Sequence, residues 1–186
     1  MNEVQALLTL RGLKHLPRAG WVRVGVDAPE SVAAHSWGVA LWVLTHLPPG
    51  LDVGRALAYA VLHDVAEAIV GDITPYDGVP PERKAALEHD AVRELLAAWP
   101  DLITLWETYE AQTDDEARFV RQLDRADMVW EASCLTRDGA GDLSAFHESA
   151  GRVVTDATLS GRLSQLRNAV DASHDLVVES TLRRSR

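Results

Sequence analysis

Apolar residues recur at helical spacing through almost the whole of this 186-residue chain, and that periodicity limits the folds open to it. The sequence has no sustained alternation of apolar and polar residues, and no Asn-Gly or Asp-Gly pair joins two such runs, as a β-hairpin would require. We therefore expect an all-α protein. The expected helices are 2–14, 31–47, 52–70, 80–98, 101–111, 114–137, 142–150 and 156–182.

Helix-capping and helix-breaking residues support these boundaries. Ser31 can cap the second expected helix, and Gly71 can end the third. The loop DGAGD at 138–142 separates a core of about 10–137 from C-terminal helices of about 142–182. A chain of this length suits one domain with one sizeable core, so we expect a single domain over residues 1–186.

Charge and cysteine content exclude several classes of protein. The formal net charge is -10, which argues against a polyanionic partner such as nucleic acid but leaves a small phosphorylated substrate possible. The one cysteine, Cys134, allows no intrachain disulfide and no cysteine-based zinc cluster. The apolar stretch at 37–47 is shorter than the roughly 20 residues that a bilayer requires, and the N-terminus reads as a first helix. We expect a cytoplasmic protein that does not bind membranes.

One stretch places ionisable groups where an apolar helix should meet the core. It reads LHDVAEAIVGD, residues 62–72, and it contains His63, Asp64, Glu67 and Asp72. Buried ionised groups are costly unless they are paired, hydrogen-bonded or bound to a metal. An imidazole beside a carboxylate suits Mn²⁺, Co²⁺, Fe²⁺, Zn²⁺ or Mg²⁺. The alternative is a surface pair or a satisfied hydrogen bond.

A metal site needs further ligands from elsewhere in the chain. His35 is one polar group among apolar neighbours in SVAAHSWGVALWV, where it could also be a hydrogen-bonded core histidine. Asp124 lies in FVRQLDRADMVWEA, and Asp127, three residues on, competes with it for the role. The later histidines His89 and His147, like His174, lie in polar surroundings, which favours a site for one metal ion rather than two.

Three blocks of the sequence, in this order, resemble the HD-domain superfamily of metal-dependent phosphohydrolases. The blocks are PRAGWVRVGVDAPESVAAHS, LAYAVLHDVAEAIVGDITP and EARFVRQLDRADMVWEAS. They look like the corresponding parts of the HD domain-containing protein 2 group and of bacterial 5′-deoxynucleotidases. The resemblance covers about residues 10–137, and it implies a helical HD-domain bundle with additional C-terminal helices.

The resemblance also implies roles for single residues. The positions that match the family's metal ligands are His35, His63, Asp64 and Asp124. Glu67 and Asp72 match the acidic residues used around the attacking water and the leaving group. Arg18 and Trp21 match residues that contact the substrate phosphate and its surroundings, with Arg23 as the alternative phosphate ligand. Ala19 and Gly20 separate Arg18 from Trp21, whereas the bacterial nucleotidases have the two residues adjacent.

The implied activity is removal of the 5′-phosphate from deoxyribonucleoside monophosphates, with one divalent metal ion and a homodimeric assembly. Two alternatives stay open. The chain could be an HD phosphohydrolase acting on a cyclic nucleotide, a nucleoside triphosphate or a non-nucleotide phosphate, or it could be a catalytically silent helical scaffold. Trp99 and Trp106 could serve a dimer interface or could pack in the core.

Overall fold

The computed structural model describes the backbone of residues 1–184 and the side chains of residues 1–170. In this part of the chain the regular structure is helical, and the one extended pairing is an isolated bridge between Pro17 and Ser31. The all-α prediction is therefore confirmed. The chain divides into two compact units, Met1–Arg121 and Gln122–Arg186. The single domain expected over the whole sequence stays a prediction.

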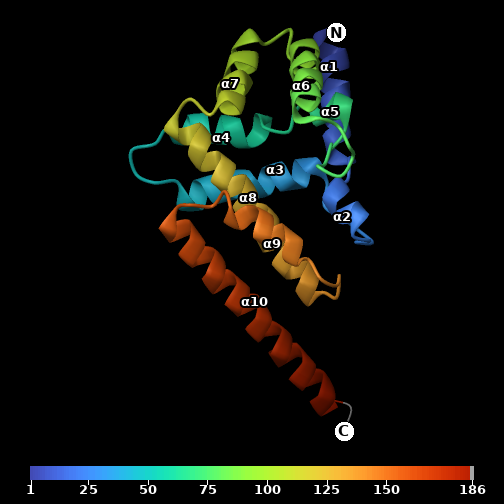
Figure 1. Ribbon diagram of the computed structural model, residues 1–186, viewed down its shortest axis with the longest axis vertical. Coiled ribbons are helices and arrows are strands. Elements are labelled where there is room, and N and C mark those ends of the chain that lie inside the picture. Colours follow the sequence, from blue (N-terminus) through green and yellow to red (C-terminus); the bar gives the residue numbers. More distant parts are fainter. Residues whose placement is uncertain (185–186) are drawn as a thin grey trace. The chain divides into compact units, whose positions relative to one another are not determined.

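Most of the helices belong to the first unit (Figure 1). They are α1 (Glu3–Leu10), the 3₁₀-helix η1 (Arg11–Lys14), α2 (Ala19–Arg23), α3 (Val32–His46), α4 (Val53–Leu62), α5 (Glu67–Val70), α6 (Pro81–Leu95) and α7 (Pro100–Ala111). Helix α8 (Asp115–Arg137) begins in the first unit and continues into the second. The second unit also contains α9 (Ser144–Gly151) and α10 (Ala157–Arg184).

Three features of the structure differ from the expected helices. The helix expected at 2–14 is α-helical only as far as Leu10 and continues as the 3₁₀-helix η1. The helix expected at 52–70 is interrupted, because α4 ends at Leu62 and α5 begins only at Glu67. Helix α2 was not expected, because five residues that include Gly20 are too few to show apolar periodicity. Its position depends on tertiary packing, since Trp21 is buried with an exposed fraction of 2%.

Side-chain caps fix where several helices begin. Ser31 Oγ accepts a hydrogen bond from the Ala34 backbone N–H at 3.1 Å, as the sequence predicted for the start of α3. Asp52 Oδ1 accepts from the backbone N–H groups of Gly54 and Arg55 and so begins α4. These caps satisfy backbone donors that have no partner inside their own helix.

The segment between α4 and α5 is held by an apolar cluster. Leu62, Val65 and Ala66 are buried together with residues of α6 and α7, and the members from those helices include Val92, Leu95 and Trp106. Burying each large apolar side chain contributes about 1.5–3 kcal/mol. The indole N–H of Trp106 also donates to the His63 carbonyl at 3.3 Å. The cluster thus fixes the backbone that carries His63.

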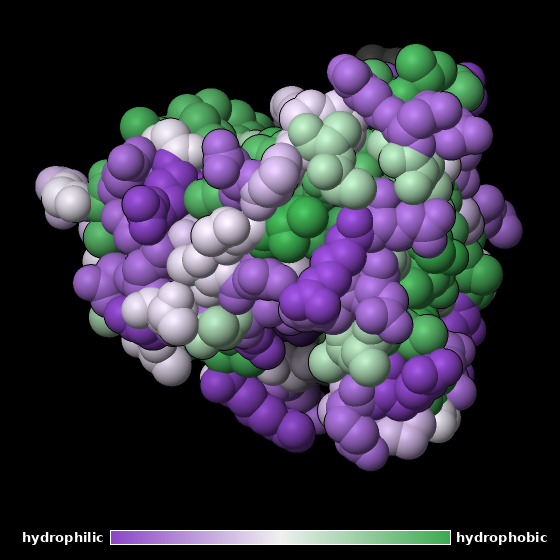
Figure 2. All heavy atoms as spheres, turned by 90° about the horizontal axis from the view of Figure 1, so that it is seen from above, coloured by the Kyte–Doolittle hydropathy of each residue, from purple (hydrophilic) through white to green (hydrophobic). Residues whose placement is uncertain are grey.

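The two tryptophans left open by the sequence both pack in this region. Trp106 is a core residue with an exposed fraction of 3%, and Trp99 is partly buried against the same cluster. The exposed tryptophan is Trp37 on α3, at 69%. On the face shown in Figure 2, hydrophobic residues are interspersed with hydrophilic ones. Among the described residues, no helix has both the length and the apolar character needed to cross a bilayer.

A polar network in the first unit connects α4 to the start of α8. Asp114 Oδ2 accepts from the Tyr59 hydroxyl at 2.6 Å and from Arg55 Nη1 at 3.2 Å, and Asp114 Oδ1 accepts from the Ala117 backbone N–H at 2.8 Å. Burial alone would raise the pKa of Asp114, but these hydrogen bonds outweigh it and hold the pKa below its ordinary value of 3.8. Burial and the contact with Asp114 raise the pKa of Tyr59 to about 12.

We expect Asp114→Ala to lower the free energy of unfolding by about 2 kcal/mol at pH 7, because it removes a helix cap and a hydrogen bond from Tyr59. A depressed carboxyl pKa stabilises the fold at pH values above the ordinary value, and this contribution is lost as the pH falls through the folded pKa. The difference between wild type and variant should therefore shrink below pH 3.8. Urea unfolding of both proteins at pH 7 and pH 3 measures this difference in the free energy of unfolding.

The matched control is Asp115→Ala, at the neighbouring residue. Asp115 has a side-chain exposure of 74% and pairs with Arg118 three residues on. This substitution should change the free energy of unfolding by no more than about 0.5 kcal/mol. Equal losses in the two variants would contradict the role given to Asp114.

Candidate functional site

The interruption between α4 and α5 shapes the candidate site. Across residues 63–66 the backbone makes tight i→i+3 hydrogen bonds, from Val65 N–H to the Leu62 carbonyl at 3.0 Å and from Glu67 N–H to the Asp64 carbonyl at 3.1 Å. Side chains three residues apart lie nearly above one another in such a turn. The tight turn therefore places Asp64 and Glu67 on the same side of the chain.

The backbone of α4 orients the ring of His63. His63 Nδ1 lies 2.9 Å from the Ala60 carbonyl oxygen. A carbonyl oxygen can only accept, so Nδ1 carries the hydrogen of this bond. In the neutral ring the lone pair is then on Nε2, which lies 3.1 Å from Asp64 Oδ2.

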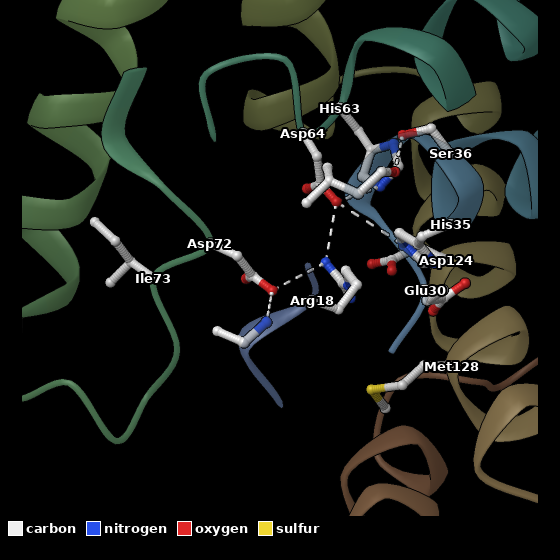
Figure 3. A network of polar contacts seen from close by, with 12 residues as sticks. Arg18, Glu30, His35, Ser36, His63, Asp64, Asp72, Ile73, Asp124 and Met128 are labelled. Atoms are coloured by element: carbon white, nitrogen blue, oxygen red, sulfur yellow. Dashed lines mark hydrogen bonds and ion pairs between the residues drawn. The ribbon is translucent and has the colours of Figure 1, made fainter. Parts of the chain in front are cut away.

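His35 reaches the same carboxylate oxygen from α3. It is fully buried, and its Nε2 lies 3.9 Å from Asp64 Oδ2. The His35 and His63 rings meet edge to face, with centroids 5.3 Å apart. One ligand atom from each of His35, His63 and Asp64 falls within 4.8 Å of the other two. Figure 3 shows the three side chains pointing toward one another.

Arg18 and Asp72 lie on the other side of the Asp64 carboxylate. Arg18 Nη1 donates to Asp64 Oδ2 at 3.2 Å and lies 3.8 Å from Asp72 Oδ2 (Figure 3). The same Asp72 oxygen accepts from the Ala19 backbone N–H at 2.8 Å, at the start of α2. Asp72 therefore holds both the side chain of Arg18 and the backbone that follows it.

Glu67 is a buried acid beside these charges. Its exposed fraction is 5%, and within the described part of the chain its Oε2 makes no hydrogen bond. Burial, together with the nearby carboxylates of Asp64 and Asp72, raises the pKa of Glu67 to about 10. At neutral pH this carboxyl is protonated and can donate a hydrogen bond.

Asp64 has the opposite protonation behaviour. Burial alone would raise the pKa of its carboxyl, but in the metal-free protein a protonated His63, which is charged and donates from Nε2, acts with the charges of Arg18 and His35 to hold the pKa well below the usual range. Two carboxyls three residues apart thus differ in state, because Asp64 is ionised and Glu67 is neutral. Divergent acids of this kind are common at catalytic sites.

The donor set fits a divalent cation. Two imidazole nitrogens and one carboxylate oxygen form the borderline set that suits Zn²⁺, Mn²⁺, Co²⁺ or Fe²⁺. A lone pair on His63 Nε2 and an anionic oxygen 3.1 Å away repel each other unless a proton or a cation lies between them. The Ala60 carbonyl accepts from His63 Nδ1 and so orients the ring with Nε2 toward Asp64, as a carbonyl commonly does for a histidine that binds a metal through its other nitrogen.

The remaining residues expected at the site occupy other positions. Trp21 is buried and its indole N–H donates to Glu30 Oε1 at 3.1 Å, so its expected contact with substrate stays a prediction. The Arg23 guanidinium carbon lies 3.9 Å from the centre of the Tyr76 ring. Asp124 and the competing Asp127 are both on α8, in the part of the chain that belongs to the second unit, and the assignment of Asp124 as the metal ligand, which the resemblance favours, stays a prediction.

Sequence reasoning did not single out Lys84. Its Nζ donates to the Ile73 carbonyl at 2.9 Å, next to Asp72, and lies 3.5 Å from Glu88. Lys84 stands in the polar first turns of α6, where a lysine is ordinary, so the sequence gives no signal that it reaches this loop.

We expect Glu67→Gln to stabilise the metal-free protein at pH 8. A raised carboxyl pKa stabilises the fold at pH values below the ordinary value of 4.5, and this contribution is lost as the pH rises toward the folded pKa. Glutamine is neutral at every pH, so the Glu67→Gln protein should not lose stability from this position as the pH rises. Urea unfolding between pH 5 and pH 9 measures the difference.

The matched control is Asp64→Asn, which should destabilise the protein because Asp64 is ionised and paired. Lower stability of Glu67→Gln at pH 8 would contradict the protonated state.

Comparison with known proteins gives a consistent set of matches. The sequence matches the HD domain family over residues 10–161. The 5′-deoxynucleotidase HDDC2 of Mus musculus is 35% identical over 168 residues, covering 87% of this chain and 84% of the mouse protein. The 5′-deoxynucleotidase hdd1 of Schizosaccharomyces pombe is 32% identical over 177 residues, covering 89% of each chain. A crystal structure of a Pyrococcus horikoshii protein matches with a TM-score of 0.73 at 33% identity, covering 90% of this chain and 97% of that one.

Proposed function

Because this chain belongs to the HD domain family, we propose that it is a metal-dependent phosphohydrolase that removes the 5′-phosphate from deoxyribonucleoside monophosphates. The names of its mouse and fission yeast relatives support this reaction. One observation carries the proposal: two buried histidines and Arg18 all approach the single oxygen Asp64 Oδ2. That arrangement combines ligands for a cation with a guanidinium suited to phosphate.

The proposed ligands of the cation are His35, His63 and Asp64, completed by Asp124, with Asp127 as the alternative. Their nitrogen and oxygen donors suit one divalent ion of Co, Mn, Mg, Fe or Zn. When bound, such an ion polarises a phosphoryl oxygen and lowers the pKa of a coordinated water. Phosphate binding and proton transfer are then carried out by side chains of this chain.

Arg18 is the proposed phosphate ligand. A guanidinium binds phosphate oxygens through charge-assisted, bidentate hydrogen bonds. The contacts of Arg18 with Asp64 and Asp72 hold its guanidinium group beside the proposed cation ligands. Arg23 is the less favoured candidate, because its guanidinium is stacked on Tyr76.

Glu67 and Asp72 divide the proton chemistry in this proposal. Glu67, a buried acid with an Oε2 that has no hydrogen-bond partner among the described residues, orients the attacking water by a hydrogen bond at that oxygen, and it accepts the water's proton only after its own carboxyl has lost one. Asp72 accepts from the Ala19 N–H and pairs with Arg18, which supports a role in orienting the phosphate ligand. Protonation of the leaving 5′-oxygen by Asp72 is the alternative role. The cytoplasmic location and homodimeric assembly expected from the sequence remain predictions.

The reaction is tested on purified, metal-stripped protein. Phosphate release from dAMP, dGMP, dCMP and dTMP should appear on addition of Co²⁺, Mn²⁺ or Mg²⁺, and the matching ribonucleotides and a cyclic nucleotide serve as comparison substrates. Turnover of the comparison substrates alone would indicate a different HD phosphohydrolase. Absence of turnover with every substrate and every metal would end the proposal and favour a silent scaffold.

Two substitutions separate metal binding from proton transfer. Asp64→Ala should abolish both metal content and turnover, because it removes the oxygen that His35, His63 and Arg18 all approach. Glu67→Gln should retain the metal and lower kcat by about 100-fold or more, as expected for loss of a general acid or base. Metal analysis by mass spectrometry and steady-state kinetics make the comparison. Equal loss of metal in the two variants would contradict this division of roles.

A further inference from the structure

Lys84 is a cation near the candidate site to which no role has been given. It lies in the second half of the first turn of α6, and its side-chain exposure is 37%. Its ammonium group donates to the backbone carbonyl of Ile73 at 2.9 Å. Ile73 directly follows Asp72, the residue that holds Arg18 and the start of α2.

The loop that carries Asp72 and Ile73 is held by side-chain contacts rather than by regular structure. It begins at Gly71, whose φ of 78° ends α5, and residues 71–74 belong to neither a helix nor a strand. The next part closes on itself, because Asp77 Oδ2 accepts from both the backbone and the hydroxyl of Thr74. Between these two turns, within the described residues, the loop accepts hydrogen bonds from the Ala19 N–H on one side and from Lys84 Nζ on the other.

These contacts form a continuous chain from α6 to the proposed phosphate ligand. Lys84 fixes the carbonyl of Ile73, and the adjacent Asp72 fixes the Ala19 backbone at 2.8 Å and the Arg18 guanidinium at 3.8 Å. A displacement of about 1 Å in a positioning group can cost a large part of the rate, even when that group does not touch the substrate. Lys84 Nζ also pairs with Glu88 Oε1 at 3.5 Å, and the Glu88 side chain is only 15% exposed.

We propose that Lys84 is a positioning residue that holds the Asp72–Ile73 loop through the Ile73 carbonyl and thereby sets Arg18 for binding of a phosphate monoester. The inference rests on the proposed function and adds a residue to it. A lysine can act here because its ammonium group can donate to the Ile73 carbonyl while it pairs with the Glu88 carboxylate.

The test compares Lys84→Met, Lys84→Arg and Glu88→Gln in the full-length, metal-loaded protein. Methionine keeps the apolar stem but cannot donate, so KM for the preferred deoxyribonucleoside monophosphate should rise about 10-fold while kcat changes less than about 3-fold. Arginine restores a cationic donor and should bring KM back to within about 3-fold of wild type. Glu88→Gln keeps the bond from Lys84 to Ile73 and should change KM less than about 3-fold. Metal content should be the same in all four proteins.

A second readout does not depend on turnover. Inorganic phosphate should raise the Tm of the wild-type protein and of Lys84→Arg, and should raise it less in Lys84→Met; Lys84→Gln replaces the methionine variant if that one fails to fold. If the wild type turns over and Lys84→Met has the same KM and the same phosphate effect, the Lys84 inference is wrong and the proposed function stands. If the wild type shows no turnover, the proposed function fails, and the phosphate titration still decides whether Lys84 supports an anion site.

Discussion

The carboxylate of Asp64 is the group around which the candidate site is organised. It is an ionised side chain at the edge of an apolar core, and burial of such a charge requires compensating partners. His63, His35 and Arg18 supply them, and all three approach the one oxygen Oδ2. Each partner comes from a different segment of the first unit, so the positions of α3, of the turn at 63–66 and of the segment before α2 are coupled through this oxygen. Loss of the Asp64 charge would leave two histidines and an arginine facing one another.

The backbone turn at residues 63–66, which presents Asp64, results from apolar packing. Leu62, Val65 and Ala66 are drawn into a cluster with α6 and α7, and Trp106 donates to the carbonyl of His63. A regular helix through residues 63–66 would place these side chains differently, whereas the tight i→i+3 hydrogen bonds keep the apolar ones in the core and the polar ones at the site. The same segment thus stabilises the fold through its apolar residues and supplies site residues through its polar ones. Substitutions in the apolar cluster are therefore expected to disturb the site as well as stability.

The sequence predicted the parts of this site that depend on local chemistry. His63, Asp64 and Glu67 stand out because ionisable residues interrupt an apolar helical pattern, and most helices follow from periodicity and from caps such as Ser31. The sequence did not predict the break after Leu62, because that break depends on contacts with α6 and α7 that no local pattern encodes. Helix α2 was missed because its five residues are too few to show apolar periodicity, and its position depends on the burial of Trp21. The hydrogen bond from Ala19 to Asp72 joins residues 53 positions apart, and the neutral state of Glu67 depends on its burial, so neither can be read from spacing. The choice between Asp124 and Asp127 still rests on resemblance.

The central claim is that His35, His63 and Asp64 share one divalent cation, and anomalous diffraction tests it most directly. Crystals grown with Zn²⁺ and measured on both sides of the zinc edge should show one strong anomalous peak about 2.0–2.2 Å from His35 Nε2, His63 Nε2 and an Asp64 carboxylate oxygen. The account would be contradicted if a fully occupied zinc site appeared elsewhere in the protein and no anomalous peak lay beside these three side chains.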